Sequence, residues 1–400
     1  MLALKNAQIH TVIGKTYKRS SILIDDQGLI KSVGSSIEFP KETQVIDCNG
    51  LQIYPGFVEA HCHIGLNREG LGSISSHANE STNPFTPDMR AFDALDCQDM
   101  HFHKALHEGG VTAANVSPGS ANVIGGSCDV ISVKPSFTAE DLLLKESIAL
   151  KMAFGENPFR VYGSRNLSPS TRMAIPALLR QELTKAINYR GKKEESKKKG
   201  SHFDLDLRLE VLCKLLDGSL TAHCHAHETI DIMTAIRVSK EYSYPLVLVH
   251  GTESARIASK LAKTKTPVIL GPQGGFNAKI ENRHRSLKTA AILFEEGVEF
   301  SISTDHPVIP LRDLRVEAAK MVNNGLPREA AIRSLTTIPA KILGLDKVIG
   351  AIEPNMRADL IVWDGDPLDV SRSRVRHAIV GGELQDPSIG SSDWIECQRT

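Results

Sequence analysis

The chain has no excess of charge of either sign. Its 400 residues include 47 Lys and Arg and 47 Asp and Glu, so the formal net charge is zero. This balance argues against a general surface for nucleic acid or for a membrane. The chain also lacks an apolar stretch of about 20 residues and a signal-peptide pattern after Met1, so we expect neither a membrane span nor export.

Cysteine is sparse and shows no pairing pattern. The chain contains seven cysteines, and two of them, Cys62 and Cys224, lie between histidines, where a disulfide would disturb the local structure. We therefore expect buried, reduced thiols and a reducing cytoplasm as the location.

A charged segment from Arg190 to Lys199 has no apolar side chain. This composition predicts a solvated, mobile crossing between two helical stretches. Nucleic-acid binding is not expected there, because Tyr189 is the only aromatic residue beside the lysines.

The most informative feature is the triplet His61-Cys62-His63 after an apolar run. Residues two apart on a strand point to the same side, so both imidazoles face one point where the strand ends. Other candidate ligands also follow β-like runs: Glu156, the ladder His223-Cys-His225-Ala-His227, His250, and Asp305-His306. This recurrence predicts a metal site built from several strand ends.

The two ends of the chain differ in pattern from its middle. Short alternating runs with turns at both ends predict one small antiparallel sheet domain. In the middle, eight strand-like runs alternate with helical stretches, at residues 53–60, 110–116, 129–133, 149–155, 220–225, 246–250, 267–270 and 299–303. This alternation predicts a (β/α)8 barrel, whose active site lies at the carboxyl ends of the strands. A doubly wound open sheet is the alternative, but it would not easily bring five strand ends to one point.

Several motifs carry a family resemblance. Pro55-Gly-Phe-Val-Glu-Ala-His61-Cys-His63, Thr304-Asp305 and the segment 349–362 resemble the amidohydrolase superfamily, and the similarity covers nearly the whole chain. Segments 119–126 and 154–158 are similar to imidazolonepropionase-related amidohydrolases, a branch that also holds peptidases acting on carboxyl-terminal residues. The resemblance implies a distorted (β/α)8 TIM barrel (residues 53–346), a β-sandwich from both termini (1–52 and 347–400), and one or two divalent metals.

The resemblance also implies a ligand set, namely His61, His63, Glu156, His225, His250 and Asp305. Many relatives have a carboxylated lysine at the place that Glu156 matches, and a glutamate supplies the same two oxygens without carbon dioxide. Lys151 is the alternative, although its strand parity is opposite to that of Glu156. His223 and His227 share a strand face with His225, so either is an alternative to it.

These ligand types suit zinc, with manganese or iron as substitutes. A cation lowers the pKa of bound water to about 7, and Asp305 would take the proton of that water and pass it to a leaving nitrogen. Residues near the strand ends are predicted to contact the substrate: His227, Glu228, Arg160, Arg165 and His306. The alternatives are that His306 caps the next helix and that both arginines are solvated.

The leading function is therefore a metal-dependent hydrolase of a C–N bond in a small amide. A mononuclear deaminase or cyclic amidine hydrolase is the second hypothesis, and a non-enzymatic assembly protein is the third. Metal analysis of the purified protein would separate these hypotheses: about two equivalents per chain favour the first, one favours the second, and none favours the third. The loops 67–90 and 271–277 would shape the pocket, so the substrate itself is not predicted. We expect a small-molecule amide as partner, no nucleic acid or membrane, and a homo-oligomer.

Overall fold

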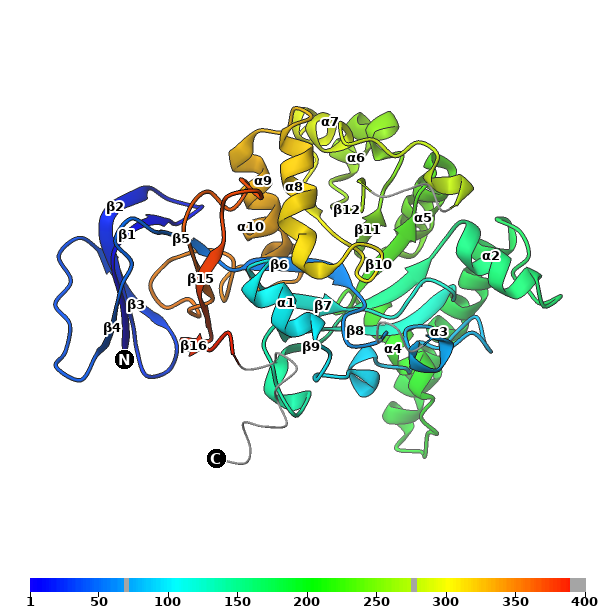
Figure 1. The fold of residues 1–400 in the computed structure, drawn as a ribbon. Helices are drawn as coiled ribbons and strands as arrows, with labels where there is room; N and C mark the ends of the chain where they lie inside the picture. Colours follow the sequence, from blue (N-terminus) through cyan, green and yellow to red (C-terminus); the bar gives the residue numbers. More distant parts are fainter. Residues whose placement is uncertain (68–71, 275–278, 389–400) are drawn as a thin grey trace.

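The protein consists of two eight-stranded sheets and surrounding helices (Figure 1). The structure is a computed structural model that describes residues 1–67, 72–274 and 279–388. Residues 68–71 and 275–278, which belong to the two loops predicted to shape the pocket, lie outside the described residues, as do residues 389–400.

One sheet forms a nearly closed barrel in the middle of the molecule. Its strands follow the order β13-β12-β11-β10-β9-β8-β7-β6. They are β6 (Phe57–Cys62), β7 (Val111–Val116), β8 (Ile124–Ser132), β9 (Leu143–Ala153), β10 (Thr221–Ala226), β11 (Leu246–His250), β12 (Val268–Leu270) and β13 (Phe300–Ile302). All eight runs expected from the sequence contribute to this sheet. Most of these strands are buried on both faces, which agrees with the small and apolar residues that make up most of their sequences.

Two details differ from the predicted barrel. β8 is antiparallel to both β7 and β9. The connections on its two sides are short, whereas a parallel pair needs a crossover of about a dozen residues or more. The run predicted at 53–60 is divided at Gly56 between the two sheets, and only its second half enters the barrel.

The two end strands of the barrel order meet at their carboxyl ends. The His63 N–H donates to the His306 carbonyl at 2.8 Å, and the Ser303 hydroxyl donates to the His61 carbonyl at 2.9 Å. These bonds join the segments that follow β6 and β13, so the ligand candidates of both strands lie at one end of the barrel.

The second sheet is assembled from both termini and is called the terminal sheet below. It contains β1 (Leu2–His10), β2 (Thr16–Ile24), β3 (Ile30–Gly34), β4 (Gln44–Asp47), β5 (Gln52–Pro55), β14 (Leu360–Trp363), β15 (Val375–Val380) and β16 (Glu383–Gln385). Its own core includes Leu4, Ile22 and Leu360. The Trp363 ring packs against Phe57 of the barrel at 5.9 Å between centroids, which links the two cores.

Helices surround the barrel sheet (Figure 1). They are α1 (His101–His107), α2 (Glu156–Gly163), α3 (Ala174–Lys199), α4 (Leu207–Leu216), α5 (Thr229–Tyr242), α6 (Ala258–Thr264), α7 (Thr289–Glu295), α8 (Leu314–Val322), α9 (Arg328–Leu335) and α10 (Thr337–Ile342). The charged run Arg190–Lys199 forms the last turns of α3, so the prediction of a mobile crossing is wrong. Ion pairs within and between helices, such as Lys193 with Glu210 at 2.5 Å, stabilise this end.

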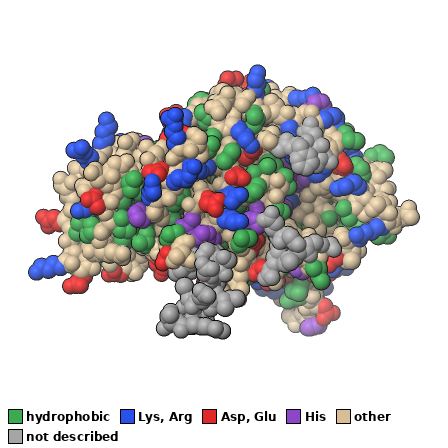
Figure 2. Space-filling model, in the orientation of Figure 1, with side chains coloured by type: hydrophobic (Ala, Val, Ile, Leu, Met, Phe, Trp, Pro, Cys, Tyr) green, Lys and Arg blue, Asp and Glu red, His purple; other side chains and the backbone are tan. Residues whose placement is uncertain are grey.

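No helix in the described part of the chain combines the length and the apolar character needed to cross a membrane. Lys and Arg side chains are interspersed with Asp and Glu over the face shown in Figure 2. This distribution agrees with the zero net charge of the sequence.

Candidate metal centre

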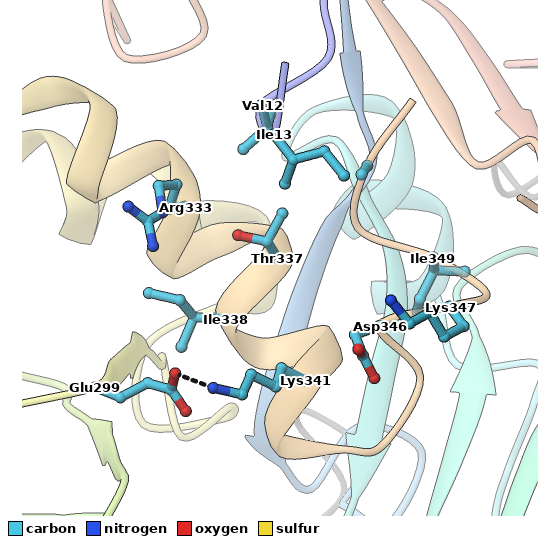
Figure 3. A pocket seen from close by; sticks show the side chains of 11 residues that line it. Val12, Ile13, Glu299, Arg333, Thr337, Ile338, Lys341, Asp346, Lys347 and Ile349 are labelled. Carbon is cyan, nitrogen blue, oxygen red and sulfur yellow. Dashed lines mark hydrogen bonds and ion pairs between the residues drawn. The ribbon is translucent and has the colours of Figure 1, made fainter. Parts of the chain in front are cut away.

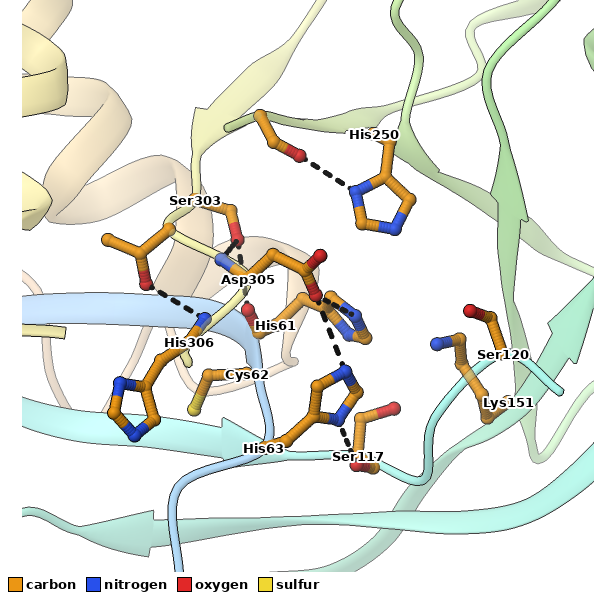
Figure 4. Close-up of polar contacts among 12 residues, drawn as sticks. His61, Cys62, His63, Ser117, Ser120, Lys151, His250, Ser303, Asp305 and His306 are labelled. Carbon is orange, nitrogen blue, oxygen red and sulfur yellow. Dashed lines mark hydrogen bonds and ion pairs between the residues drawn. The ribbon is translucent and has the colours of Figure 1, made fainter. Parts of the chain in front are cut away.

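The first ligand group joins the ends of β6 and β13 (Figure 4). Nε2 of His61 lies 3.4 Å from Oδ1 of Asp305, and Nε2 of His63 lies 3.3 Å from the same oxygen. Two ligands about 2.1 Å from a tetrahedral zinc are roughly 3.4 Å apart. Oδ1 of Asp305 therefore lies at the spacing of two ligands of one cation from each of the two imidazole nitrogens.

The hydrogen bonding of His63 shows which atom is free for a cation. Its Nδ1 donates to the Ser117 carbonyl at 2.7 Å, so in the neutral ring Nε2 carries the lone pair. That lone pair faces Oδ1 of Asp305, which is also an acceptor. Two acceptors at this distance repel each other unless a positive charge lies between them.

A second group comes from β10, β11 and the segment after β10. The rings of His225, His227 and His250 lie 4.5 to 4.6 Å apart between centroids, and one donor atom of each falls within 4.8 Å of the others. Nδ1 of His250 donates to the Gly271 carbonyl at 2.8 Å, which leaves its Nε2 as a lone pair. Nδ1 of His227 bonds to the Thr252 hydroxyl at 2.7 Å.

His250 connects the two groups, because it also lies within ligand range of His61 and Asp305. Among the described residues, neither ring nitrogen of His61 or of His225 has a hydrogen-bond partner, although both side chains are buried. A buried polar atom normally finds a partner. These orphaned nitrogens fit a divalent cation, which takes up neutral imidazole lone pairs.

Burial controls the ionisation of the centre. It lowers the pKa of His250 to about 4, and it lowers the pKa of His61 and of His225 well below the usual histidine value. Burial alone would raise the pKa of Asp305, but the neighbouring rings of His250, His61 and His63 hold that pKa well below its usual value. Neutral imidazoles and an ionised carboxylate are the forms that bind a cation.

A buried hydrogen-bond network holds the turn that carries Asp305. The Glu59 carboxylate accepts from the Thr304 N–H and hydroxyl, both at 2.8 Å, and from the His61 N–H at 3.0 Å. Asp305 has a φ of 53°, in the left-handed region, and its N–H bonds to the Ser303 hydroxyl. Sequence reasoning missed Glu59, although strand alternation places it on the same face as His61.

Lys151 and Glu156 occupy different environments. Lys151 lies on β9 with 1% exposure, points toward the histidines (Figure 4), and donates to the Pro118 carbonyl at 3.2 Å. Burial lowers its pKa to about 8. Glu156 was predicted to follow this strand directly and to lie at the pocket floor. The structure corrects this prediction, because β9 ends at Ala153 and Glu156 begins α2, 3.9 Å from Arg160. The alternative ligand His223 pairs in register with Lys151 and belongs to neither group.

The other predicted substrate residues have polar partners outside the two ligand groups. Glu228 forms ion pairs with Arg172 and, at 2.6 Å, with Arg283. Arg165 donates to the carbonyl and hydroxyl of Ser81. The side chain of Arg160 is 62% exposed. Of this predicted set, only His227 belongs to the two ligand groups described above.

His306 belongs to a third cluster, with Asp99 and His101. Asp99 bonds to Nδ1 of His101 at 2.7 Å. However, Nδ1 of His306 accepts the N–H of Leu311, so the ring hydrogen sits on Nε2. His306 thus offers no lone pair to a cation, and this cluster is better suited to holding the chain after Asp305.

Sequence reasoning also missed Glu281, in the connection between β12 and α7. Its Oε1 lies 3.6 Å from Nε2 of both His225 and His227, and 3.1 Å from the ammonium of Lys279. Oε2 accepts the N–H of Glu156 at 3.0 Å. No strand-like pattern precedes Glu281, so nothing in the sequence marked it as part of the site.

A separate pocket of about 500 Å³ lies beside α10 and the segment after β1 (Figure 3). Glu299 and Lys341 on its wall form an ion pair at 2.6 Å. The described residues that line this pocket include no histidine, so it lacks the donors of the two ligand groups.

Comparisons with known proteins agree on one family. Residues 192–389 match the model of the Amidohydrolase family. A solved amidohydrolase from Thermotoga maritima is 42% identical, with 96% of this chain and 99% of that chain covered and a TM-score of 0.93. Amidohydrolase tasK of Hapsidospora irregularis is 27% identical over 97% of this chain, which spans only 42% of that protein. Deacetylase Atu3266 of Agrobacterium fabrum is 22% identical, with 96% of this chain and 90% of that protein covered.

Proposed function

Because the chain belongs to the amidohydrolase family, we propose that it is a metal-dependent hydrolase that cleaves the C–N bond of a small amide. One observation carries the proposal, namely the opposed lone pairs of His63 Nε2 and Asp305 Oδ1 at 3.3 Å, which call for a cation. The names of the relatives, two amidohydrolases and a deacetylase, support an acylated nitrogen in the substrate.

Two cations are proposed, with zinc as the first choice for imidazole and carboxylate donors. His61, His63 and Asp305 hold the first cation, and His225 and His250 hold the second. The bridging place that Glu156 was predicted to fill goes to Lys151, as a carbamate. Lys151 is buried, faces the histidines, and has a lowered pKa, which favours the neutral amine that reacts with carbon dioxide.

The chemistry follows from the donors present. A bound divalent cation supplies Lewis acidity, which polarises an amide carbonyl and lowers the pKa of water. The Asp305 carboxylate takes one proton from the water that attacks the carbonyl carbon. It then donates that proton to the amide nitrogen as the C–N bond breaks, so the products are a carboxylate and an amine. Glu59, through Thr304, keeps Asp305 aimed at this position.

We propose that the barrel sheet is a distorted (β/α)8 barrel spanning residues 53–346. The terminal sheet then forms a second domain from residues 1–52 and 347–400. The strand ends of the barrel supply the ligands, as in other barrel enzymes. The proposed substrates are N-acyl amino acids, dipeptides and cyclic amides.

The test combines metal analysis with a substrate screen. The purified protein is dialysed, its zinc, manganese and iron are counted per chain, and hydrolysis of the three substrate classes is followed with each metal added. About two equivalents and amide hydrolysis that a chelator abolishes would support the proposal. One equivalent with deamination would favour the mononuclear alternative, and a protein that binds no metal would contradict both.

A further inference from the structure

Glu281 is held in one orientation with a carboxylate oxygen aimed at two imidazoles. The side chain is 1% exposed, and its Oε2 accepts the Glu156 N–H at the start of α2. Gly155 permits this approach, since a Cβ at that position would lie 2.8 Å from Oε2, and its φ is 85°. The contact on Oε2 leaves Oε1 to face His225 and His227.

The distances are those of ligands rather than of hydrogen bonds. Oε1 lies 3.6 Å from Nε2 of both His225 and His227, which is longer than an N–H···O bond. It is close to the roughly 3.4 Å between two ligands of a tetrahedral zinc. The first group, in which His61 and His63 approach Asp305, shows the same spacing of 3.3 to 3.4 Å.

Two imidazoles of the second group have lone pairs free for a cation. His250 presents Nε2 as a lone pair, because its Nδ1 donates to a carbonyl. Neither nitrogen of His225 has a hydrogen-bond partner among the described residues. A buried carboxylate is costly unless it is paired or binds a metal. Lys279 pairs with Glu281 from one side, but it does not satisfy the imidazoles.

We propose that Glu281 is a metal ligand that holds the second cation of the centre together with His225, His227 and His250. This inference rests on the proposed function, because it assumes a second cation, and it adds two ligands to those assigned there. Three imidazoles and one carboxylate, besides the Lys151 carbamate proposed above, are donors that suit a borderline cation such as zinc. This ligand set also connects Glu281, which comes from an irregular part of the chain, to the centre.

Zinc binding to the full chain and to single variants tests this assignment. Glu281→Gln keeps an acceptor for the Glu156 N–H but weakens the ligand, and His227→Asn removes a second member of the same shell. Each variant should lose about one zinc equivalent, with the affinity of that site reduced by at least ~10–100-fold in chelator competition. The matched control is Lys279→Met, which removes the ion pair, leaves the carboxylate, and should keep both equivalents.

The outcomes distinguish a failure of the Glu281 assignment from a failure of the proposed function. Folded Glu281→Gln and His227→Asn proteins that bind zinc like the wild type would overturn the role of Glu281, while the proposed hydrolase would stand. Loss of zinc in Lys279→Met as great as in Glu281→Gln would also overturn it, because the ion pair would then explain the effect. A wild-type chain that binds no zinc would refute the proposed function and the inference together.

Discussion

Replacement of Glu59 tests whether the barrel interior positions Asp305. Glu59 is fully buried on β6, and its two oxygens accept three hydrogen bonds, from His61 and from both donors of Thr304. Glutamine has the same shape but only one acceptor oxygen, so it cannot satisfy both sides. If that oxygen faces Thr304, the amide NH2 faces the His61 N–H, and one buried donor loses its acceptor.

The magnitude follows from the number of donors left without an acceptor. Each costs about 1–3 kcal/mol, so Glu59→Gln should lower the free energy of unfolding by about 1–3 kcal/mol. Glu59→Ala leaves up to three donors without an acceptor, so it should lower the free energy of unfolding by up to about 3–9 kcal/mol. This loss is comparable with the whole stability of a typical domain, about 5–15 kcal/mol. Turnover of Glu59→Gln should fall about 100-fold, the cost of misplacing a catalytic group by about 1 Å.

Urea unfolding and amide hydrolysis at pH 8 measure both effects. Burial raises the pKa of Glu59 to about 7, which is still below the assay pH, so the wild-type side chain is mostly ionised at pH 8. Asp359→Asn is the matched control, because Asp359 is also a buried carboxylate that accepts a backbone N–H, from Gly381 at 2.7 Å, but it directly precedes β14 of the terminal sheet. The control should lose stability and keep its turnover. A Glu59→Gln protein with wild-type stability and turnover would refute the positioning role.

Sequence patterns identified the candidate ligands at the ends of regular strands. His61 and His63 share a strand face, and His250 and Asp305 come directly after apolar runs, so period-two alternation and strand ends were sufficient to single them out. The structure brings these four side chains together. Their joint assignment to metal binding stays a prediction until metal is measured.

Other parts of the site depend on geometry that alternation does not describe. The alternation of side chains along β9 cannot be extended to Glu156, because Gly155 has a positive φ and the chain turns away after Ala153. Lys151, inside the regular strand, is the side chain that faces the histidines. Glu281 comes from an irregular segment whose path is set by tertiary packing. The sequence pattern did not indicate that β8 is antiparallel, because the predicted run, 129–133, missed the first five residues of the strand.

The remaining predictions concern acid–base groups of the centre. Asp305→Asn keeps one ligand oxygen but accepts no proton, so turnover should fall by about 10²–10⁴ in steady-state assays, and near-normal turnover with metal retained would exclude its role. Lys151→Met should lose about one metal equivalent by elemental analysis, whereas a variant with two equivalents would rule out the bridging carbamate. Metal-free protein should lose stability as the pH falls, because burial lowers the pKa of His250 and of His306 to about 4 and that of His223 to about 3. The unfolded chain, with histidine pKa values near 6.5, takes up these protons first, so the contribution of these three histidines to stability is constant above about pH 7 and declines below 6.5. At pH 5 each of the three histidines should cost about 2 kcal/mol, since 1.5 pH units at about 1.36 kcal/mol separate that pH from 6.5. The three histidines together contribute about 6 kcal/mol, and protonation of Glu59, whose pKa burial raises to about 7, offsets part of this loss at pH 5. Urea unfolding of the zinc-free protein at pH 8 and pH 5 measures the net loss, and equal or greater stability at pH 5 would show that these rings are not held neutral by burial.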